Sequence, residues 1–304
     1  MITLKKDFLI GSIPPLVTPF KSGKLDLDAY ARLIEFQIKN GTHGILVNGT
    51  TSEPSTLTIA ERNELVRVAV EVTRKRIPVV AATGSQSHAE SVELTEFATK
   101  AGVDATLIVT PYYIRAPQRG VAEYFIDLGL RSDVPMMMYH IPGRSAFKVE
   151  MPTLERIAEK VPHFVGIKHA VDDHSFVTEM LHRFGPDFRV FVGLEEFTFS
   201  MMAVGALGTM NAVANLAPAQ VAAMCNETLA GNMAAARKLH FELFELMRAV
   251  FFDTNPIPMK YMMKRLGIID RNEHRLPMVP ATPELEKRLD AVLVRAGLLS
   301  AKAA

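Results

Sequence analysis

The sequence predicts a (β/α)8 barrel, an α/β fold of eight parallel strands alternating with helices, with a helical C-terminal extension. Two observations favour this fold. Eight short apolar runs recur between residues 12 and 213, with longer amphipathic stretches between them. The runs are continuously apolar, as in strands that are covered on both faces. An open doubly wound sheet is the alternative, but the chain lacks a glycine-rich nucleotide-binding turn.

The expected strands lie, in chain order, at 12–20, 44–48, 78–83, 105–110, 135–140, 165–169, 189–193 and 208–213. Helices are expected between them, for example over 28–39, 60–74, 89–101 and 153–160. Thr58 and Ser87 are suitable N-caps, and Gly41 and Gly102 follow expected helix ends.

After residue 229 the strand pattern stops. The remaining chain predicts helices over 233–251, 256–266 and 283–296, separated by turns that contain Pro or Gly. We therefore expect a barrel that carries the active site at 1–229 and a helical extension at 230–304.

Composition narrows the possible functions. Lys and Arg (34) nearly balance Asp and Glu (33), which argues against nucleic acid or a membrane surface as the main partner. The single cysteine, Cys225, excludes an intrachain disulfide and a Cys-rich metal site. We find no signal-peptide pattern and no apolar run of about 18 residues, so a cytoplasmic protein is expected.

The site of such a barrel lies where its strands end, and Lys168 ends the run 165–169. An ordinary lysine, with a pKa of about 10.4, is neutral only about 0.04% of the time at pH 7. Burial would lower its pKa and supply the free amine that attacks a carbonyl to form a Schiff base. The alternative is a lysine paired with a neighbouring carboxylate.

Neighbouring strand ends offer groups that suit this chemistry. Tyr139 ends the preceding strand and could carry protons, although it could equally be a half-buried tyrosine bonded to a backbone carbonyl. The hydroxyls of Thr50 and Thr51 could hold a carboxylate, or simply form a turn. Arg144 could bind a second carboxylate, or be solvated.

Metal chemistry finds little support in the sequence. There is no H-E-x-x-H motif, and Asp172 with Asp173 is better explained as a helix start. The loops that often bind phosphate in such barrels carry Glu195 and Glu196, which argues against a phosphorylated substrate. We expect no metal.

Five motifs in order carry a family resemblance. They are Gly49-Thr50-Thr51-x-Glu53, Thr110-Pro111-Tyr112-Tyr113, Tyr139-x-x-Pro142-Gly143-Arg144, Gly166-Ile167-Lys168 and Asn255-Pro256-Ile257-Pro258-x-Lys260. With these motifs the chain resembles the dihydrodipicolinate synthase / N-acetylneuraminate lyase family of class I pyruvate-dependent aldolases, from about residue 10 to 299. Each motif is weak alone, and the ordered set is specific.

The resemblance implies roles for the matching residues. Lys168 would form the imine with pyruvate or a related 2-oxo acid, so no cofactor is required. Tyr139 would be the general acid/base, in a proton relay with Thr50 and Tyr113. Tyr113 would reach a neighbouring subunit's site, which implies a homo-oligomer, usually a tetramer built from dimers. Thr50, Thr51 and the backbone of Met210 would bind the oxo acid.

Arg144 matches the branch of the family that condenses pyruvate with aspartate semialdehyde, where it would bind the carboxylate of the aldehyde. Departures leave the aldehyde open: His140 replaces a usual asparagine, His169 a usual glutamate, and Gly193-Leu-Glu-Glu a usual Gly-Asp-Asp. We expect His140 and His169 to contact the second substrate. The alternatives are another 2-oxo acid aldolase, a hydratase-aldolase or a dehydratase, and, outside these enzymes, an oxo-acid-binding sensor barrel or a metal-dependent aldolase.

Overall fold

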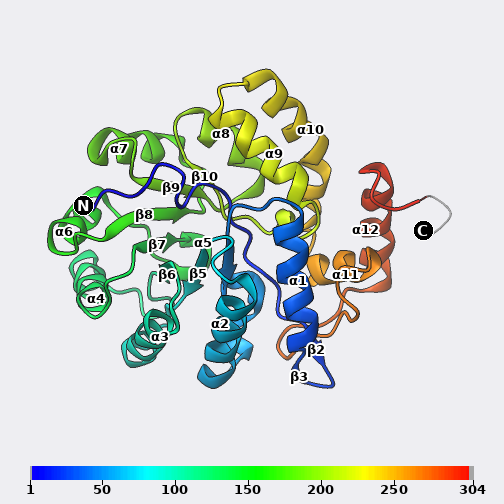
Figure 1. Cartoon of the computed structure of the whole chain (residues 1–304), viewed down its shortest axis with the longest axis horizontal. Helices are drawn as coiled ribbons and strands as arrows, with labels where there is room; N and C mark the ends of the chain where they lie inside the picture. The colour runs from blue at the N-terminus through cyan, green and yellow to red at the C-terminus, as the bar shows by residue number, and fades with distance from the viewer. Residues whose placement is uncertain (1, 301–304) are drawn as a thin grey trace.

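The computed structural model describes residues 2–300 and confirms the predicted barrel (Figure 1). Eight parallel strands pair in the order β1-β10-β9-β8-β7-β6-β5-β4. Pro15 bridges Leu46 in parallel, so the segment after β1 meets β4 and closes the sheet. The strands are β1 (Gly11–Ser12), β4 (Ile45–Val47), β5 (Val79–Ala82), β6 (Ala105–Val109), β7 (Met136–His140), β8 (Phe164–His169), β9 (Arg189–Val192) and β10 (Gly208–Thr209).

Helices surround these strands in Figure 1. They are α1 (Leu27–Lys39), α2 (Ile59–Thr73), α3 (His88–Ala101), α4 (Gln118–Leu130), α6 (Met151–Lys160), α7 (His174–Phe184), α8 (Thr198–Ala203) and α9 (Pro218–Leu229). The predicted caps are confirmed: Thr58 forms a capping box with Glu61, Ser87 caps α3, and Gly102 ends it at φ 85°.

The first and the last expected strands are much shorter than predicted. The first, expected over 12–20, pairs in the barrel as β1 and the Pro15 bridge only, because Pro14 and Pro15 have no N–H to donate. Its end, β2 (Phe20–Lys21), forms an antiparallel hairpin with β3 (Lys24–Leu25) instead. The last, expected over 208–213, stops at Thr209 and soon enters the 3-10 turn η4 (Val213–Asn215).

The barrel interior is a packed apolar core. Its buried side chains include Leu46, Val80, Leu107, Met137, Val165, Phe191 and Met210, in one cluster with Tyr139. Where β1 and β10 meet, a Cβ on Gly208 would lie 2.1 Å from the carbonyl oxygen of Gly11, so no other residue fits there.

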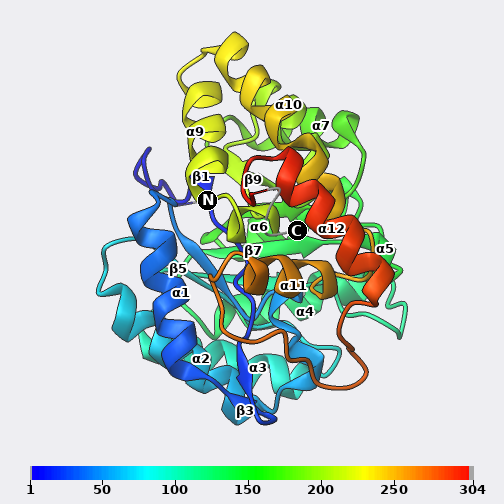
Figure 2. The same cartoon turned by 90° about the vertical axis from the view of Figure 1, so that its right-hand side faces the viewer.

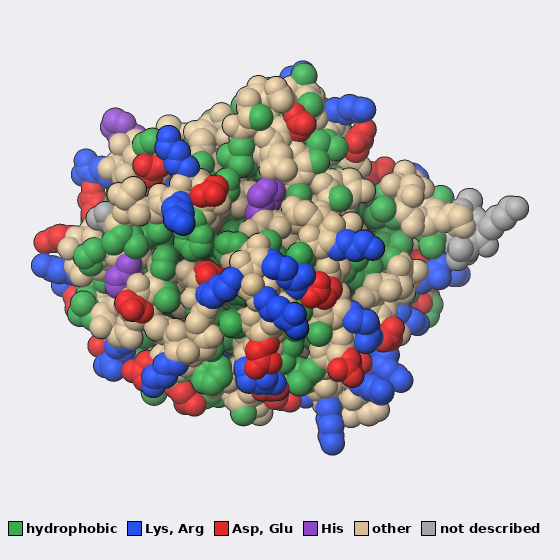
Figure 3. Space-filling view, viewed as in Figure 1, with side chains coloured by type: hydrophobic (Ala, Val, Ile, Leu, Met, Phe, Trp, Pro, Cys, Tyr) green, Lys and Arg blue, Asp and Glu red, His purple; other side chains and the backbone are tan. Residues whose placement is uncertain are grey.

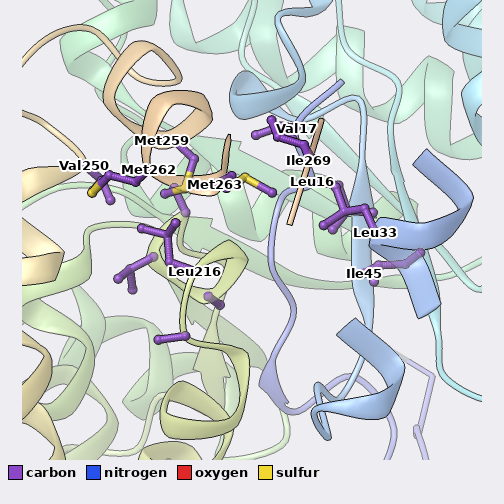
Figure 4. Packing of buried hydrophobic residues seen from close by; sticks show 14 of the residues in the cluster. Leu16, Val17, Leu33, Ile45, Leu216, Val250, Met259, Met262, Met263 and Ile269 are labelled. Carbon is purple, nitrogen blue, oxygen red and sulfur yellow. The ribbon is translucent and has the colours of Figure 1, made fainter. Parts of the chain in front are cut away.

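The C-terminal helices α10 (Met233–Ala249), α11 (Ile257–Arg265) and α12 (Pro283–Arg295) confirm the expected helical extension. They pack on one side of the barrel, which faces the viewer in Figure 2. Met259, Met262 and Met263 of α11 share a buried apolar cluster with Leu16 and Val17 (Figure 4). Because this cluster runs across residue 229, the division of the chain into two parts at that residue stays a prediction.

On the face seen in Figure 3, acidic and basic side chains are interspersed, and no large patch carries charges of one sign. Within residues 2–300, no helix combines the length and the apolar character that crossing a membrane requires.

Candidate active site

Lys168 and Tyr139 lie side by side at the C-terminal ends of their strands. They are register partners on β8 and β7, and the Nζ atom of Lys168 is 4.3 Å from the centre of the Tyr139 ring. Lys168 is only 3% exposed. Burial lowers the pKa of Lys168 to about 8, and the positive charge of Arg144 adds to this, while Glu195 opposes it. About one tenth of this amine is therefore unprotonated at pH 7, against about 0.04% of an ordinary lysine.

The Tyr139 hydroxyl has a polar neighbour on the opposite side of the barrel mouth. The Oγ1 atom of Thr50, in the 3-10 turn η1 (Thr50–Ser52), donates to it at 3.5 Å, a long hydrogen bond. Burial raises the pKa of Tyr139 to about 12, which keeps the phenol protonated. A protonated phenol can donate to a developing oxyanion and then exchange its proton through Thr50.

Glu195 brings a buried carboxyl group to the same site. It opens the 3-10 turn η3 (Glu195–Phe197) after β9, and its Oε1 atom accepts from the N–H groups of Ala212 (2.6 Å) and Val213 (3.4 Å). Burial raises the pKa of Glu195 to about 7, and the charge of Lys168 opposes this rise. Its Oε2 atom has no hydrogen-bond partner among the described residues.

The close approach of Gly193 explains how this loop reaches Lys168. A Cβ on Gly193 would lie 3.1 Å from Cε of Lys168 and 2.8 Å from Cβ of Ala170. Glycine therefore lets the start of the loop pass beside the lysine stem. Glu195 was predicted only as part of an acidic loop. Its place two residues after the predicted strand end at 193 could have identified it as a site residue.

The C-terminal extension holds the loop that carries Thr50 and Thr51. Nδ2 of Asn255 donates to Oγ1 of Thr51 at 2.9 Å. In the same loop, Glu53 forms an ion pair with Lys260 of α11, with 2.9 Å between Oε1 and Nζ, and both side chains are fully buried. The motif residues Asn255 and Lys260 thus support the site from outside the barrel.

Both members of the Glu53–Lys260 ion pair make further polar contacts. Nζ of Lys260 also donates to the carbonyl oxygen of Thr18 at 3.0 Å and to that of Glu273, and Oε2 of Glu53 contacts Nδ1 of His274 at 3.3 Å. Burial would raise the pKa of Glu53, but His274 and Lys260 outweigh it and the net shift is downward. Burial lowers the pKa of Lys260, and Glu53 opposes this. The low pKa of Glu53 indicates a carboxylate that is charged in the folded protein.

The structure gathers most of the predicted site residues and leaves three apart, namely Tyr113, His140 and His169. Arg144, on the short helix α5 (Pro142–Ser145), is exposed and close enough to perturb the pKa values of both Lys168 and Tyr139. Met210 is fully buried in the inner cluster with Tyr139, and Thr51 is buried in η1. Tyr113 is 84% exposed and makes no hydrogen bond within the described part of this single chain.

His140 and His169 do not join the other predicted residues. They follow Tyr139 and Lys168 directly, and successive side chains of a strand point to opposite faces. Their rings therefore lie on the outer face of the sheet, where both contact the ring of Phe176 in α7. Both are fully buried, so direct contact with a substrate at the barrel mouth does not fit their position.

Glu195 also lines a cavity of about 400 Å³ between η3 and the C-terminal helices. Leu194, Phe251 and Phe252 form its apolar wall, and the guanidinium of Arg288 stacks 3.3 Å above the Phe252 ring. No group of three or more His, Cys, Asp or Glu side chains in residues 2–300 is placed to hold a metal ion.

Comparison with known proteins adds independent findings. The model of the dihydrodipicolinate synthetase family matches residues 8–296. The 4-hydroxy-tetrahydrodipicolinate synthase of Thermus thermophilus is 42% identical over 290 residues, which cover 95% of this chain and 97% of that protein.

Solved structures are similar as well. The dihydrodipicolinate synthase of Aquifex aeolicus superposes with a TM-score of 0.93 at 37% identity, covering 95% of this chain and 98% of that one. A chloride-inhibited dihydrodipicolinate synthase of Acinetobacter baumannii, solved in complex with pyruvate, has a TM-score of 0.92 at 33% identity, covering 96% of this chain and all of that one.

Proposed function

The chain belongs to the dihydrodipicolinate synthetase family, and on that basis we propose that it is a Schiff-base-forming lyase of the 4-hydroxy-tetrahydrodipicolinate synthase type. It would condense pyruvate with aspartate semialdehyde. The observation that carries this proposal is the buried amine of Lys168, whose lowered pKa and position 4.3 Å from the Tyr139 ring suit attack on a ketone.

The residues of the site support a sequence of steps. The carboxylate of pyruvate binds at the turn with Thr50 and Thr51, and the neutral amine of Lys168 attacks the C2 carbonyl. Tyr139 protonates the carbinolamine oxygen, which leaves as water, and an iminium ion remains. The iminium makes the C3 proton acidic, and its loss gives an enamine whose C3 attacks the aldehyde carbon. Tyr139 takes up this C3 proton and passes it to the aldehyde oxygen as the new bond forms. The amino group of the aspartate semialdehyde moiety then adds to the imine carbon and expels the Lys168 amine, which frees the product.

Two charged side chains at the site, Glu195 and Arg144, suit the proposed intermediates and substrate. The iminium keeps a positive charge next to Glu195, whose carboxylate would stabilise it in this buried setting. Arg144 is exposed at the mouth, where its planar guanidinium can bind the carboxylate of an incoming aldehyde in a bidentate manner.

Glu195 favours a second candidate, an aldolase of the same family that takes a different aldehyde. Its Oε2 atom has no partner among the described residues and could accept from a hydroxyl group that aspartate semialdehyde lacks. Leu194 and Glu195 stand where the family usually has an acidic pair, which changes the wall that meets the second substrate.

Three further parts of the proposal rest on the family and the site. Lys168 itself supplies the electron sink, so activity should need no dissociable cofactor and should survive chelators. The exposed Tyr113 would complete the relay of a neighbouring subunit in a homotetramer built from dimers. The enzyme would work in the cytoplasm on small soluble substrates.

Steady-state kinetics with pyruvate and a panel of aldehydes tests the proposed reaction. Aspartate semialdehyde should be turned over with a higher kcat/KM than hydroxylated or simple aldehydes, and a Lys168→Met variant should be inactive with all of them. Preference for a hydroxylated aldehyde would select the second candidate. Wild-type turnover of none of them would refute the proposed condensation.

A further inference from the structure

His140 and His169 form a hydrogen-bonded pair directly behind Lys168 and Tyr139. They are register partners on β7 and β8, their ring centres are 5.3 Å apart, and their Nδ1 atoms are 3.3 Å apart. Both side chains are fully buried. A contact between two ring nitrogens requires one to donate and the other to accept, so the two rings have different roles.

The backbone fixes which ring donates. The N–H of Val149 donates to Nε2 of His140 at 3.1 Å, so this nitrogen carries no proton. A neutral His140 then holds its proton on Nδ1 and donates it to Nδ1 of His169. His169 in turn holds its proton on Nε2, which has no hydrogen-bond partner by distance and angle among the described residues. The backbone of Asp173 is near enough to affect the pKa of His169.

The surroundings keep both rings neutral. Burial lowers the pKa of His140 to about 3 and that of His169 to about 4. The charges that face the pair come from Lys148 and His174, which lower the pKa values, and from Asp173, which raises them. A proton on either ring would place a charge in an apolar setting and remove the acceptor that the other partner uses.

The pair connects the segment after Arg144 to β8, the strand that carries Lys168. Val149 ends the segment that begins with Arg144, while Asp173 closes the loop after Lys168 and caps α7 through a hydrogen bond with the N–H of Phe176. A second connection runs in parallel at the surface, where Nζ of Lys148 pairs with Oδ2 of Asp173 at 3.1 Å. The segment after Arg144 is therefore held by two contacts, the buried histidine pair and the ion pair at the surface.

We propose that His140 and His169 are positioning residues: their directed hydrogen bond fixes the loop that carries Arg144 relative to Lys168, and so sets the aldehyde subsite. The link to catalysis rests on the proposed function, whereas the hydrogen-bond direction rests on geometry alone. The pair lies on the outer face of β7 and β8, the strands that carry Tyr139 and Lys168 on their inner face, and it does not contact the substrate.

The hydrogen-bond direction is tested in the wild-type protein by ¹⁵N NMR of the histidine rings, assigned with single substitutions. His140 should be neutral with its proton on Nδ1, and His169 neutral with its proton on Nε2, from pH 8 down to about pH 5, a unit above the higher of their lowered pKa values. The same tautomer at both rings, or an imidazolium at either one at pH 6, would overturn the proposal.

The positioning role is tested with His140→Leu, His169→Leu and the double variant. Each should lower kcat/KM for the carboxylated aldehyde by about 10²-fold, as expected for a displaced binding group, and the double variant should lose no more than the singles. Trapping of the pyruvate imine on Lys168 should stay within about twofold of wild type. His140→Asn combined with His169→Glu offers a new donor–acceptor pair and should recover most of the loss.

His163, at the opposite end of β8, provides the control, because His163→Asn should change none of these values. If wild type traps no imine, the proposed function fails and the NMR result still decides the hydrogen-bond direction. If wild type traps the imine, two results would refute the positioning role. One is unchanged aldehyde kinetics in the leucine variants. The other is an equal fall in imine formation and aldehyde kcat/KM, which indicates general loss of structure.

Discussion

Replacing Lys260 by methionine should destabilise the protein strongly, although the residue lies outside the barrel. The change leaves the Glu53 carboxylate without the ammonium 2.9 Å away, while both side chains are fully buried in the wild type. Removing one member of such a pair typically costs about 3–5 kcal/mol of unfolding free energy. Much of this is the penalty of a buried charge that keeps only its contact with His274.

This loss converts into a melting shift that can be measured. An unfolding entropy of about 2.1 cal/mol/K per residue gives roughly 0.64 kcal/mol/K for 304 residues. A loss of about 3–5 kcal/mol therefore lowers Tm by roughly 5–8 °C. The assay is thermal unfolding followed by circular dichroism at one fixed protein concentration, because any oligomer makes Tm depend on concentration.

Two further variants make this test specific. Lys264→Met, on an exposed position of the same helix, should change the unfolding free energy by no more than about 0.5 kcal/mol. Adding Glu53→Gln to Lys260→Met removes the unpaired charge and should recover part of the stability. A Lys260→Met protein within about 1 kcal/mol of wild type, or a double variant no better than the single one, would refute the reasoning.

Three other predictions concern the strand ends. Tyr139→Phe should lower kcat by roughly 10²–10⁴-fold, which steady-state kinetics checks, and a near-normal rate would exclude it as the proton carrier. Glu195→Gln removes the carboxylate that raises the pKa of Lys168. The midpoint pH at which the rate of imine formation rises should therefore fall below the wild-type value of about 8, and an unchanged midpoint would contradict this. Lys168→Met should raise the free energy of unfolding by up to about 3 kcal/mol at pH 7, because a lysine whose folded pKa is about 8 rather than 10.5 destabilises the charged folded protein. The gain should disappear above pH 10.5, where the lysine is neutral in both states, and an equal gain at both pH values would refute that origin.

Much of the fold could be predicted because its strands are apolar runs separated by amphipathic helices. The errors have local causes. Pro14 and Pro15 lie within an apolar stretch that is typical of a strand, but neither has an N–H to pair. At the last strand of the barrel, the chain leaves β10 after Thr209, and the apolar residues that follow pack in η4 instead. Composition cannot distinguish these segments from a longer strand.

The site was predictable where a strand end and a chemical requirement coincide. Lys168 and Tyr139 satisfy both conditions, and they are neighbours in the structure. The prediction that His140 and His169 contact the substrate ignored the alternation of side chains along a strand: if Lys168 points inward, His169 points outward. The supports from Asn255 and Lys260 join positions about 200 residues apart, which no local pattern reveals.

The most direct test of the central claim is to trap the imine. The wild-type protein is treated with borohydride in the presence of pyruvate, digested, and analysed by peptide mass spectrometry, with Lys168→Met as the control. The account predicts a reduced pyruvate adduct on Lys168 of the wild type and none on the variant. An adduct on another lysine, or no adduct while pyruvate is shown to bind, would contradict it.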